Sequence, residues 1–321
     1  MLRYLAQRAV AFIPTLIGVS LLVFFAIRLI PGDAITATLG TESGMLTQNQ
    51  RAALERYYGL DRPAGEQYFV WLGEAVQGNL GFSIRYGEPV LALILARFPL
   101  TLQLAVMAVV IGLAIGLPIG LLSAIRHNTL LDLLGRLFAL VGLSMPNFLL
   151  GTLIIYVLSV YFGILPNAGN YVSLAQNPLL NLQQMFFPAL TLGFAFAASV
   201  MRMTRSSMLE VLGEDYVRTA RSKGLREGRV ITRHALRNAL IPVVTLVGVQ
   251  MGYLLGGTFI VEQIFALPGL GRLTVNAITQ REYALVQGAT LFIALNFVLI
   301  NLAVDVLYAA IDPRISYSRS S

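Results

Sequence analysis

Six long apolar stretches constrain this chain more than any other feature. A helix needs about 20 mostly apolar residues to cross the hydrocarbon core of a bilayer. Hydrophobic residues make up 56% of the 321 residues and charged residues 12%. This composition is typical of membrane proteins, so we predict an all-α integral membrane protein with about six transmembrane helices. The expected spans are residues 9–28, 100–125, 137–162, 182–201, 239–261 and 285–311. Pro188 interrupts the fourth, where it removes an intrahelical hydrogen bond.

The distribution of basic residues predicts the orientation of these helices. Nine Lys or Arg residues fall between positions 202 and 238, whereas the stretch 163–181 carries no charge. Cytoplasmic loops hold an excess of basic residues, so we place both termini in the cytoplasm. The same asymmetry explains the net charge of +7 without any need for nucleic acid. We therefore divide the chain into an N-terminal tail with the first helix, an external loop subdomain, a five-helix core that contains the inner loop 202–238, and a cytoplasmic tail. Their bounds are 1–30, 31–98, 99–311 and 312–321.

The outer segment 31–98 could form a small structure of its own. Thr47 and Gln50 have the spacing of a capping box, which predicts a helix over 51–58, and a second helix is expected over 66–76. Three aromatic residues of the second helix could lie at the membrane interface or in the core of this segment: Tyr68, Phe69 and Trp71. The segment is too small for an independent enzyme, so we expect a docking or lid element on the outer face.

The residue inventory argues against several kinds of active site. Cysteine is absent, which excludes disulfides and thiolate sites, and His127 and His234 fall in expected cytoplasmic loops. Lys223 is the only lysine and Gly224 follows it rather than preceding it, so no phosphate-binding loop with the G-x-x-x-x-G-K-[ST] pattern can exist. We therefore expect no metal or cofactor bound by this chain and no ATP hydrolysis by it.

Few polar residues fall inside the expected spans. Asp305 lies deep in the last span, where an unpaired charge costs on the order of 2.5–3.5 kcal/mol on insertion scales. A structural partner such as a loop arginine is the simpler expectation for it, and a role in ion coupling is the alternative. Four further polar residues are candidate pathway residues, with structural hydrogen bonding between helices as the alternative for each. They are Ser144, Asn147, Gln250 and Asn296.

Two spans carry glycines at every fourth position. The second span has Gly112, Gly116 and Gly120, and the fifth has Gly248, Gly252 and Gly256. Such stripes let helices approach closely in lipid. Ordinary helix packing is the expected role, and lining a pathway is the alternative.

The inner loop contains an unusually well-defined short helix. Acidic residues open it and basic residues crowd its end, as the helix dipole favours: Glu214, Asp215, Arg218, Arg221 and Lys223. Gly224 is placed to end the helix in the left-handed conformation, with Leu225 packing back on it. Tyr216, Val217 and Ala220 are expected to form one small apolar face. A rigid helix that faces the cytoplasm is suited to being held by another protein.

This loop resembles the conserved cytoplasmic loop of importer-type ABC permeases, in which Glu-Ala-Ala is followed after three residues by Gly and later by Pro. Arg218, Thr219 and Ala220 stand at the Glu-Ala-Ala positions, Gly224 at the glycine and Pro242 at the distal proline. The departures from the general pattern are similar to the peptide/nickel branch, where Asp-Tyr-Val-Arg-Thr-Ala-Arg-x-Lys-Gly-Leu is typical. This chain matches that run at residues 215–225.

Further motifs of the same family follow in the family's order along the chain. They are RLIPGD at 28–33, GLDRP at 59–63, GNLGFS at 78–83, PGLGRL at 268–273 and DPR at 312–314. The chain thus resembles the dipeptide/oligopeptide/nickel family of ABC importer permeases, and its N-terminal pattern is similar to the B-type subunit rather than the C-type partner.

The resemblance implies a type I ABC importer permease in a bacterial or archaeal cell membrane. It implies an alternating-access pathway shared with a homologous C-type permease, two cytoplasmic P-loop ATPases that bind ATP and Mg, and an extracytoplasmic solute-binding protein. Residues 214–225 would be the ATPase-coupling helix, with its basic residues facing an acidic groove. The solute is expected to be a di- or oligopeptide, although the resemblance also covers carriers of glutathione-like compounds and nickel chelates.

Two other classes of function stay open on the sequence alone. A stand-alone carrier driven by an ion gradient would need an ion site, for which Asp305 is the one candidate inside a span. A non-transporting subunit of a respiratory or assembly complex is disfavoured by the absence of cofactor ligands and by the family motifs.

Overall fold

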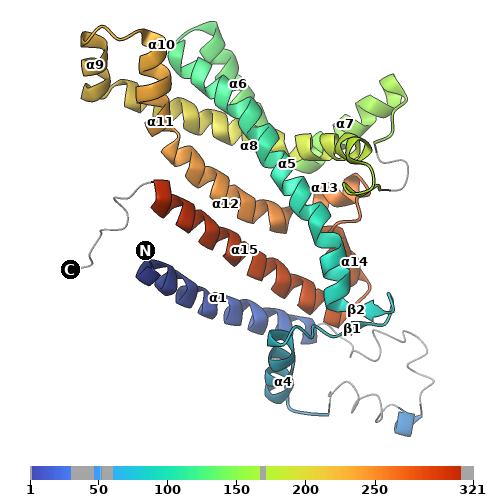
Figure 1. Ribbon diagram of the computed structural model, residues 1–321. Helices are drawn as coiled ribbons and strands as arrows, with labels where there is room; N and C mark the ends of the chain where they lie inside the picture. The colour runs from blue at the N-terminus through green and yellow to red at the C-terminus, as the bar shows by residue number, and fades with distance from the viewer. Residues whose placement is uncertain (1, 30–46, 51, 53–60, 167–170, 312–321) are drawn as a thin grey trace. The chain divides into compact units, whose positions relative to one another are not determined.

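The computed structural model of the protein is almost entirely helical (Figure 1). It describes five stretches of the chain: residues 2–29, 47–50, 52, 61–166 and 171–311. In these stretches, four helices are long and apolar enough to cross a membrane, and the number rises to six if each of two bent helix pairs counts as one span. The prediction of an all-α integral membrane protein is thereby confirmed.

The chain divides into two compact units. The first comprises residues 1–101 and 268–321, and the second comprises residues 102–267. Helix α5 (Val90–Ile125) begins in the first unit and ends in the second.

The first unit is built from the two ends of the chain. Its helices are α1 (Leu2–Arg28), α4 (Ala64–Val76), the start of α5, α14 (Leu270–Thr279) and α15 (Tyr283–Ile311). Helices α1 and α15 lie side by side (Figure 1). The first and sixth predicted spans fall within these two helices.

An apolar core in the first unit explains why α5 starts ten residues before the predicted span. Val90 and Ile94 are fully buried and pack in one cluster with Leu270 of α14 and Leu285 of α15. Burial of these side chains stabilises the extra helical turns, and the helix continues through Pro99. Residues 90–98, which we assigned to the outer segment, are therefore part of α5.

The two predicted helices of the outer segment fare differently. The capping box is present: the Thr47 amide donates to Gln50 Oε1 at 2.9 Å, and the Gln50 amide donates to Thr47 Oγ1 at 3.4 Å. Residues 51 and 53–60 of the predicted helix and its stop lie outside the described residues. The second prediction is confirmed by α4, which is followed by Gly78 in the left-handed conformation (φ 87°).

The aromatic residues of α4 separate into two groups. Tyr68 is buried, its ring lies edge-on to Phe24 of α1 with centroids 5.3 Å apart, and its hydroxyl pairs with Ser20 Oγ at 2.9 Å. Trp71 also packs against Phe24, at 5.7 Å. Phe69 is exposed. Two of the three therefore belong to a core shared by α1 and α4.

A short hairpin follows α4 in the first unit. Strands β1 (Phe82–Ser83) and β2 (Glu88–Pro89) are antiparallel, with Phe82 opposite Pro89 and Ser83 opposite Glu88. The carboxylate of Glu282, beside the start of α15, accepts hydrogen bonds from Ser83 Oγ at 3.0 Å and from the Arg85 amide at 3.1 Å. One acidic side chain thus fastens the hairpin to the last helix.

The second unit holds the rest of α5 and all elements up to residue 267. These are α6 (Leu130–Ser144), α7 (Asn147–Phe162), α8 (Pro178–Leu212), α9 (Asp215–Ser222), α10 (Glu227–Arg229), the π-helix η2 (Val230–Ala235), α11 (Leu236–Ala239), α12 (Ile241–Gly257) and α13 (Phe259–Ile264).

The third apolar stretch is not the single helix that was predicted over 137–162. It forms α6 and α7, which are bent by 102° at the break between them. Pro146 lacks an amide hydrogen and disfavours the helical conformation in the residue before it. Met145 accordingly has extended backbone angles (φ −85°, ψ 118°).

The fourth stretch is longer than predicted. Helix α8 has 35 residues instead of the expected 182–201, and Pro188 lies inside it without interrupting it. Its start is capped by Asn177, whose side chain accepts a hydrogen bond from the Leu180 amide at 3.1 Å. The polar end beyond residue 201 stays helical because side chains such as Met208 are buried there against neighbouring elements.

The glycine stripe of the second span packs closely, as predicted for ordinary helix packing. A Cβ atom built on Gly116 of α5 would lie 2.5 Å from the Ala197 carbonyl oxygen of α8. A Cβ atom on Gly193 of α8 would in turn lie 2.8 Å from the Ala108 carbonyl oxygen. In the fifth span, by contrast, a Cβ on Gly256 would meet nothing within 4 Å.

The fifth stretch forms a shorter helix than expected. The predicted span 239–261 is divided between α11, α12 and α13, and the segment that ends with α11 is bent by 44° from α12. Pro242 lies in the first turn of α12, where its missing amide hydrogen costs no intrahelical hydrogen bond. It therefore starts this helix rather than kinking it.

Candidate functional site

Helix α9 ends as the sequence predicts. Gly224 has a left-handed backbone (φ 73°), and its amide donates to the Arg221 carbonyl at 2.9 Å. The Leu225 amide donates to the Ala220 carbonyl at 3.4 Å, which completes a Schellman motif. At the other end, Glu214 is the N-cap but makes no side-chain capping bond, so its charge alone complements the helix dipole.

The apolar face of α9 is covered by the chain itself. Val217 and Ala220 are buried in one cluster with Val230 of η2. We expected these residues to form one small apolar face with Tyr216, but Tyr216 keeps a large exposed fraction, 42%. Its hydroxyl accepts a hydrogen bond from Asn238 Nδ2 of α11 at 2.7 Å. Val217 and Ala220 therefore anchor α9 to η2 and to the end of α8.

The outward side of α9 is polar. Its exposed charged and hydroxyl residues, with those that flank it, are Glu214, Asp215, Arg218, Thr219, Arg221, Ser222 and Lys223, and Tyr216 is exposed beside them. The Thr219 hydroxyl donates to the Asp215 carbonyl at 2.9 Å and so is satisfied within the helix.

The basic residues of α9 differ in how far they are engaged within the loop. Arg221 Nη2 donates to Glu227 Oε1 at 2.7 Å, and this bond raises the pKa of Arg221. Arg218 lies 3.5 Å from Asp215, but both side chains are largely exposed, so this ion pair contributes little. Lys223 at the C-cap is also exposed. Arg218 and Lys223 thus project the positive charge that a partner could meet.

A second apolar cluster supports the rest of the loop. Ala235 of η2 and Ala239 of α11 are buried against Met208 of α8 and Ala124 of α5. The π-helical turn therefore lies between two packed clusters, and π-turns are frequent at functional sites. Together the clusters hold α9 on the ends of two long helices, as Figure 1 shows for α8 and α9.

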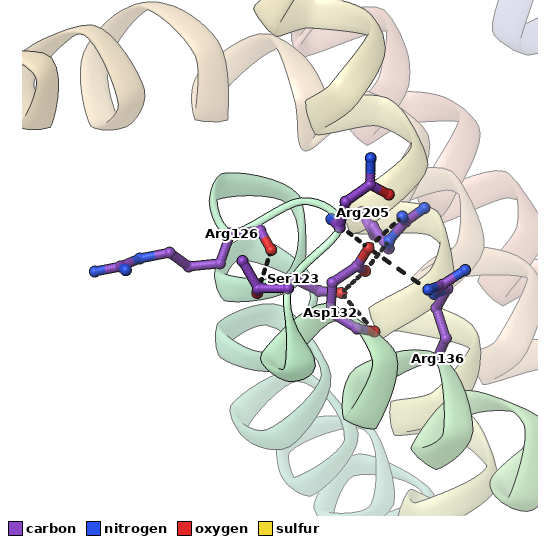
Figure 2. A network of polar contacts seen from close by, with 7 residues as sticks. Ser123, Arg126, Asp132, Arg136 and Arg205 are labelled. Carbon is purple, nitrogen blue, oxygen red and sulfur yellow. Dashed lines mark hydrogen bonds and ion pairs between the residues drawn. The ribbon is translucent and has the colours of Figure 1, made fainter.

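A polar network that no sequence pattern predicts surrounds Asp132, close to these helix ends (Figure 2). The Asp132 carboxylate is fully buried and forms a two-point ion pair with Arg205 of α8, Nε to Oδ1 at 2.6 Å and Nη2 to Oδ2 at 2.9 Å. Ser123 Oγ of α5 donates to Oδ1 at 2.6 Å, and the Asn128 amide donates to Oδ2 at 3.1 Å. Arg136 Nε lies 3.8 Å away.

The sequence signal for this network is weak. Asp132 stands in the first turn of α6, three residues after Thr129, which is an ordinary position for an acidic residue. Its partner Arg205 lies 73 positions further along and is one of nine basic residues of the inner segment. Only the packing of α6 on α8 brings the two together.

Within the described residues, no three His, Asp or Glu residues gather as potential metal ligands. The candidate site consists of a rigid helix, α9, with exposed cations at Arg218 and Lys223, and of the nearby buried ion pair between Asp132 and Arg205.

Known proteins are similar to this sequence over nearly its whole length. Residues 116–317 match the family described as the binding-protein-dependent transport system inner membrane component, and residues 1–105 match the N-terminal part of such membrane components. The chain belongs to this family of ABC importer permeases. The predicted resemblance is confirmed, and with it the expected multi-pass membrane permease.

Named relatives of the permease cover nearly all of it. A protein of Brucella suis biovar 1 that is named as a peptide permease is 43% identical over 317 residues, which is 98% of this chain and 99% of the relative. The glutathione transport system permease protein GsiC of Escherichia coli O6:H1 is also 43% identical over 317 residues, covering 99% and 100%.

A solved structure shows the fold of the permease. The MetNI methionine ABC transporter, in inward-facing conformations, aligns with a TM-score of 0.53 at 18% identity over 68% of this chain and 96% of that one. The permease therefore has the type I ABC importer fold that was predicted.

Three of the candidate pathway residues lie in the second unit of the permease. Ser144 is the last residue of α6 and Asn147 the first of α7, so they flank the bend at Pro146. Gln250 is half-buried on α12. A polar pair at a helix break is a suitable place for contact with a solute, and this role stays a prediction.

The other two intramembrane polar residues lie on α15 in the first unit. Asn296 Nδ2 donates to the Phe292 carbonyl at 2.8 Å, one turn earlier in the same helix. This bond is local, so the prediction of a pathway role for Asn296 gains no support from it. Asp305 lies within the bounds of α15, but its side chain lies outside the described residues.

Proposed function

We propose that this permease is the B-type half of a translocation pathway for short peptides in a bacterial or archaeal cell membrane. The other half would be a homologous C-type permease. An extracytoplasmic binding protein would deliver the solute, and two cytoplasmic P-loop ATPases would bind ATP and Mg and supply the energy. The permease itself would bind no cofactor.

One observation carries this proposal: α9 is a stiff helix whose C-terminal end is fixed and whose inner face is anchored. The Schellman stop at Gly224 holds one end, and Val217 and Ala220 pack α9 against the cluster at the end of α8. A helix held in this way moves as a rigid body with its neighbours. A partner that grips its outer side can therefore displace the membrane helices without unfolding the contact.

The proposed solute class follows from the chemistry of the relatives. One is named for peptides and another for glutathione, which is itself a tripeptide, and each is 43% identical over nearly the full chain. A short peptide presents amide groups and two charged ends. Neutral polar groups such as Ser144 and Asn147 can hydrogen-bond to backbone amides of any sequence, which suits a pathway that leaves selection to a binding protein.

The test is purification of the tagged permease from its native membrane, followed by reconstitution in liposomes. We expect stoichiometric recovery of a second permease and P-loop ATPases, with uptake of a labelled di- or tripeptide that requires ATP and the binding protein. Recovery of the chain alone, with uptake driven by an ion gradient, would instead establish a secondary carrier and direct attention to Asp305.

The exposed charges of α9 make a prediction about the ATPases. Combined reversal of Arg218→Glu and Lys223→Glu should weaken ATPase association about tenfold, which corresponds to about 1.4 kcal/mol, because like charges would then face an acidic groove. The affinity of purified ATPases for the permease in nanodiscs measures this effect. Reversal of Arg226 and Arg233, which are exposed in the same loop but outside α9, is the matched control. Equal weakening by both pairs would count against a specific contact at α9.

A further inference from the structure

We propose that Asp132 is a positioning residue for energy coupling: its ion pair with Arg205 joins the ends of α5, α6 and α8 into one block that moves with α9. This inference rests on the proposed function, because it assigns a route by which motion of α9 reaches the membrane helices.

Three separate elements each contribute a hydrogen-bond donor to the Asp132 carboxylate. Ser123 belongs to α5, Asn128 to the turn before α6, and Arg205 to α8. The Arg205 contact uses two nitrogens on two oxygens, and such side-by-side pairs are the most directional ion pairs in proteins. A carboxylate bound at both oxygens cannot follow one of these elements without breaking its bonds to the others.

The helices beside the ion pair are closely packed. A Cβ atom built on Gly135 of α6 would lie 2.7 Å from Met201 Cε of α8 and 3.1 Å from Ser123 Oγ of α5. A Cβ atom on Gly120 of α5 would lie 2.7 Å from the Met201 carbonyl oxygen. Close packing of α5 against the α8 backbone and of α6 against α8 side chains therefore surrounds the buried charge pair.

The block is continuous with α9. Arg205 lies two helical turns before Leu212, where α8 ends, and the α9 cluster packs on Val211 and Leu212. Asp132 lies at the opposite end of α6 from the bend at Pro146. A displacement of α9 would thus pass through α8 and the ion pair into α6, and from there to the bend.

A purely structural ion pair is the competing explanation, and the two can be separated. A buried pair can often be replaced by neutral groups of similar size with little loss of stability, whereas removal of one partner leaves an uncompensated charge. The variant Asp132→Asn/Arg205→Met removes both charges and keeps the volume of each side chain. Arg136→Gln is the matched control, because Arg136 is on the same helix but lies 3.8 Å from the carboxylate with half of its side chain exposed.

The experiment uses the complete reconstituted complex with its permease partner, ATPases and binding protein. It measures the thermal unfolding midpoint and the number of ATP molecules hydrolysed per labelled dipeptide imported. We expect Asp132→Asn/Arg205→Met to unfold close to the wild-type midpoint but to hydrolyse at least fivefold more ATP per dipeptide. Arg136→Gln should stay within twofold of wild type.

The other outcomes are equally decisive. If the double variant hydrolysed as much ATP per imported dipeptide as wild type, the proposed role of the ion pair would be overturned, because coupling would have survived its removal. If the double variant fails to assemble, Arg205→Lys keeps the charge but not the two-point geometry; a raised ratio in it supports the proposal and a wild-type ratio overturns it. A wild-type complex without ATP-linked uptake would instead refute the proposed function, and this inference with it.

Discussion

Gly224→Val should reduce ATP-driven uptake at least tenfold while leaving the permease inserted and folded in the membrane. Gly224 has a φ of 73°, where a β-branched residue is strained by about 1–3 kcal/mol. No heavy atom lies within 4 Å of a Cβ built there, so strain in the backbone is the whole effect. The strain is relieved only if the Schellman motif is lost, and the end of α9 is then no longer fixed. Uptake of labelled peptide by proteoliposomes, normalised to permease content, measures the loss.

The same loop supplies a matched control for this variant. Gly228 in α10 also has open space around a built Cβ, but its φ does not lie in the left-handed range. Gly228→Val should therefore transport nearly as well as wild type. Normal uptake by Gly224→Val at normal expression would show that the fixed end of α9 is not needed for coupling.

Gly116→Val should prevent the permease from forming a stable second unit. A Cβ at Gly116 would lie 2.5 Å from the Ala197 carbonyl oxygen and 2.7 Å from Val200 Cβ, and backbone atoms of a packed helix cannot move aside cheaply. Overpacking of this kind costs about 1–3 kcal/mol for small insertions, and valine adds more than one carbon atom. We expect a much lower yield of monodisperse permease in detergent, with a lowered thermal midpoint in whatever remains.

Gly18 of α1 is the control for this second variant. It lies in another candidate span, and a Cβ built on it meets nothing within 4 Å. Gly18→Val should therefore give near wild-type yield. If both valine variants lowered the yield equally, the cause would be a general effect of replacing a glycine in a membrane helix by valine. The contact between α5 and α8 would then not be responsible.

Local features of the sequence predicted most of the fold. Apolar stretches of 20 or more residues located α1, α5, α8, α12 and α15, because insertion in lipid demands length and hydrophobicity whatever the neighbours are. The stop of α9 at Gly224 was equally predictable, since left-handed backbone is a local property of glycine. Helix bounds were less predictable, because α5 and α8 are extended by burial of Val90 and Met208 against distant elements.

The features that the sequence did not predict depend on which surfaces meet. The apolar residues Val217 and Ala220 indicated that one face of α9 is covered, but the pattern is the same whether the cover is a partner or the chain itself. Asp132 and Arg205 are each unremarkable in their own segments and acquire meaning only through the packing of α6 on α8. A proline such as Pro146 disfavours a continuous helix, but whether the result is a mild kink or the observed bend of 102° depends on what packs on either side.

The uninterrupted length of α8 sets a geometric condition on the whole molecule. Its 35 residues measure about 52 Å at 1.5 Å per residue, while the hydrocarbon core is about 30 Å thick. Helix α8 is thus longer than the hydrocarbon core is thick, and α9 begins three residues after its end. Each residue turns a helix by about 100°. Inserting or deleting one residue between Arg205 and Leu212, where α8 ends, would therefore turn α9 by about 100° around the axis of α8 relative to the ion pair.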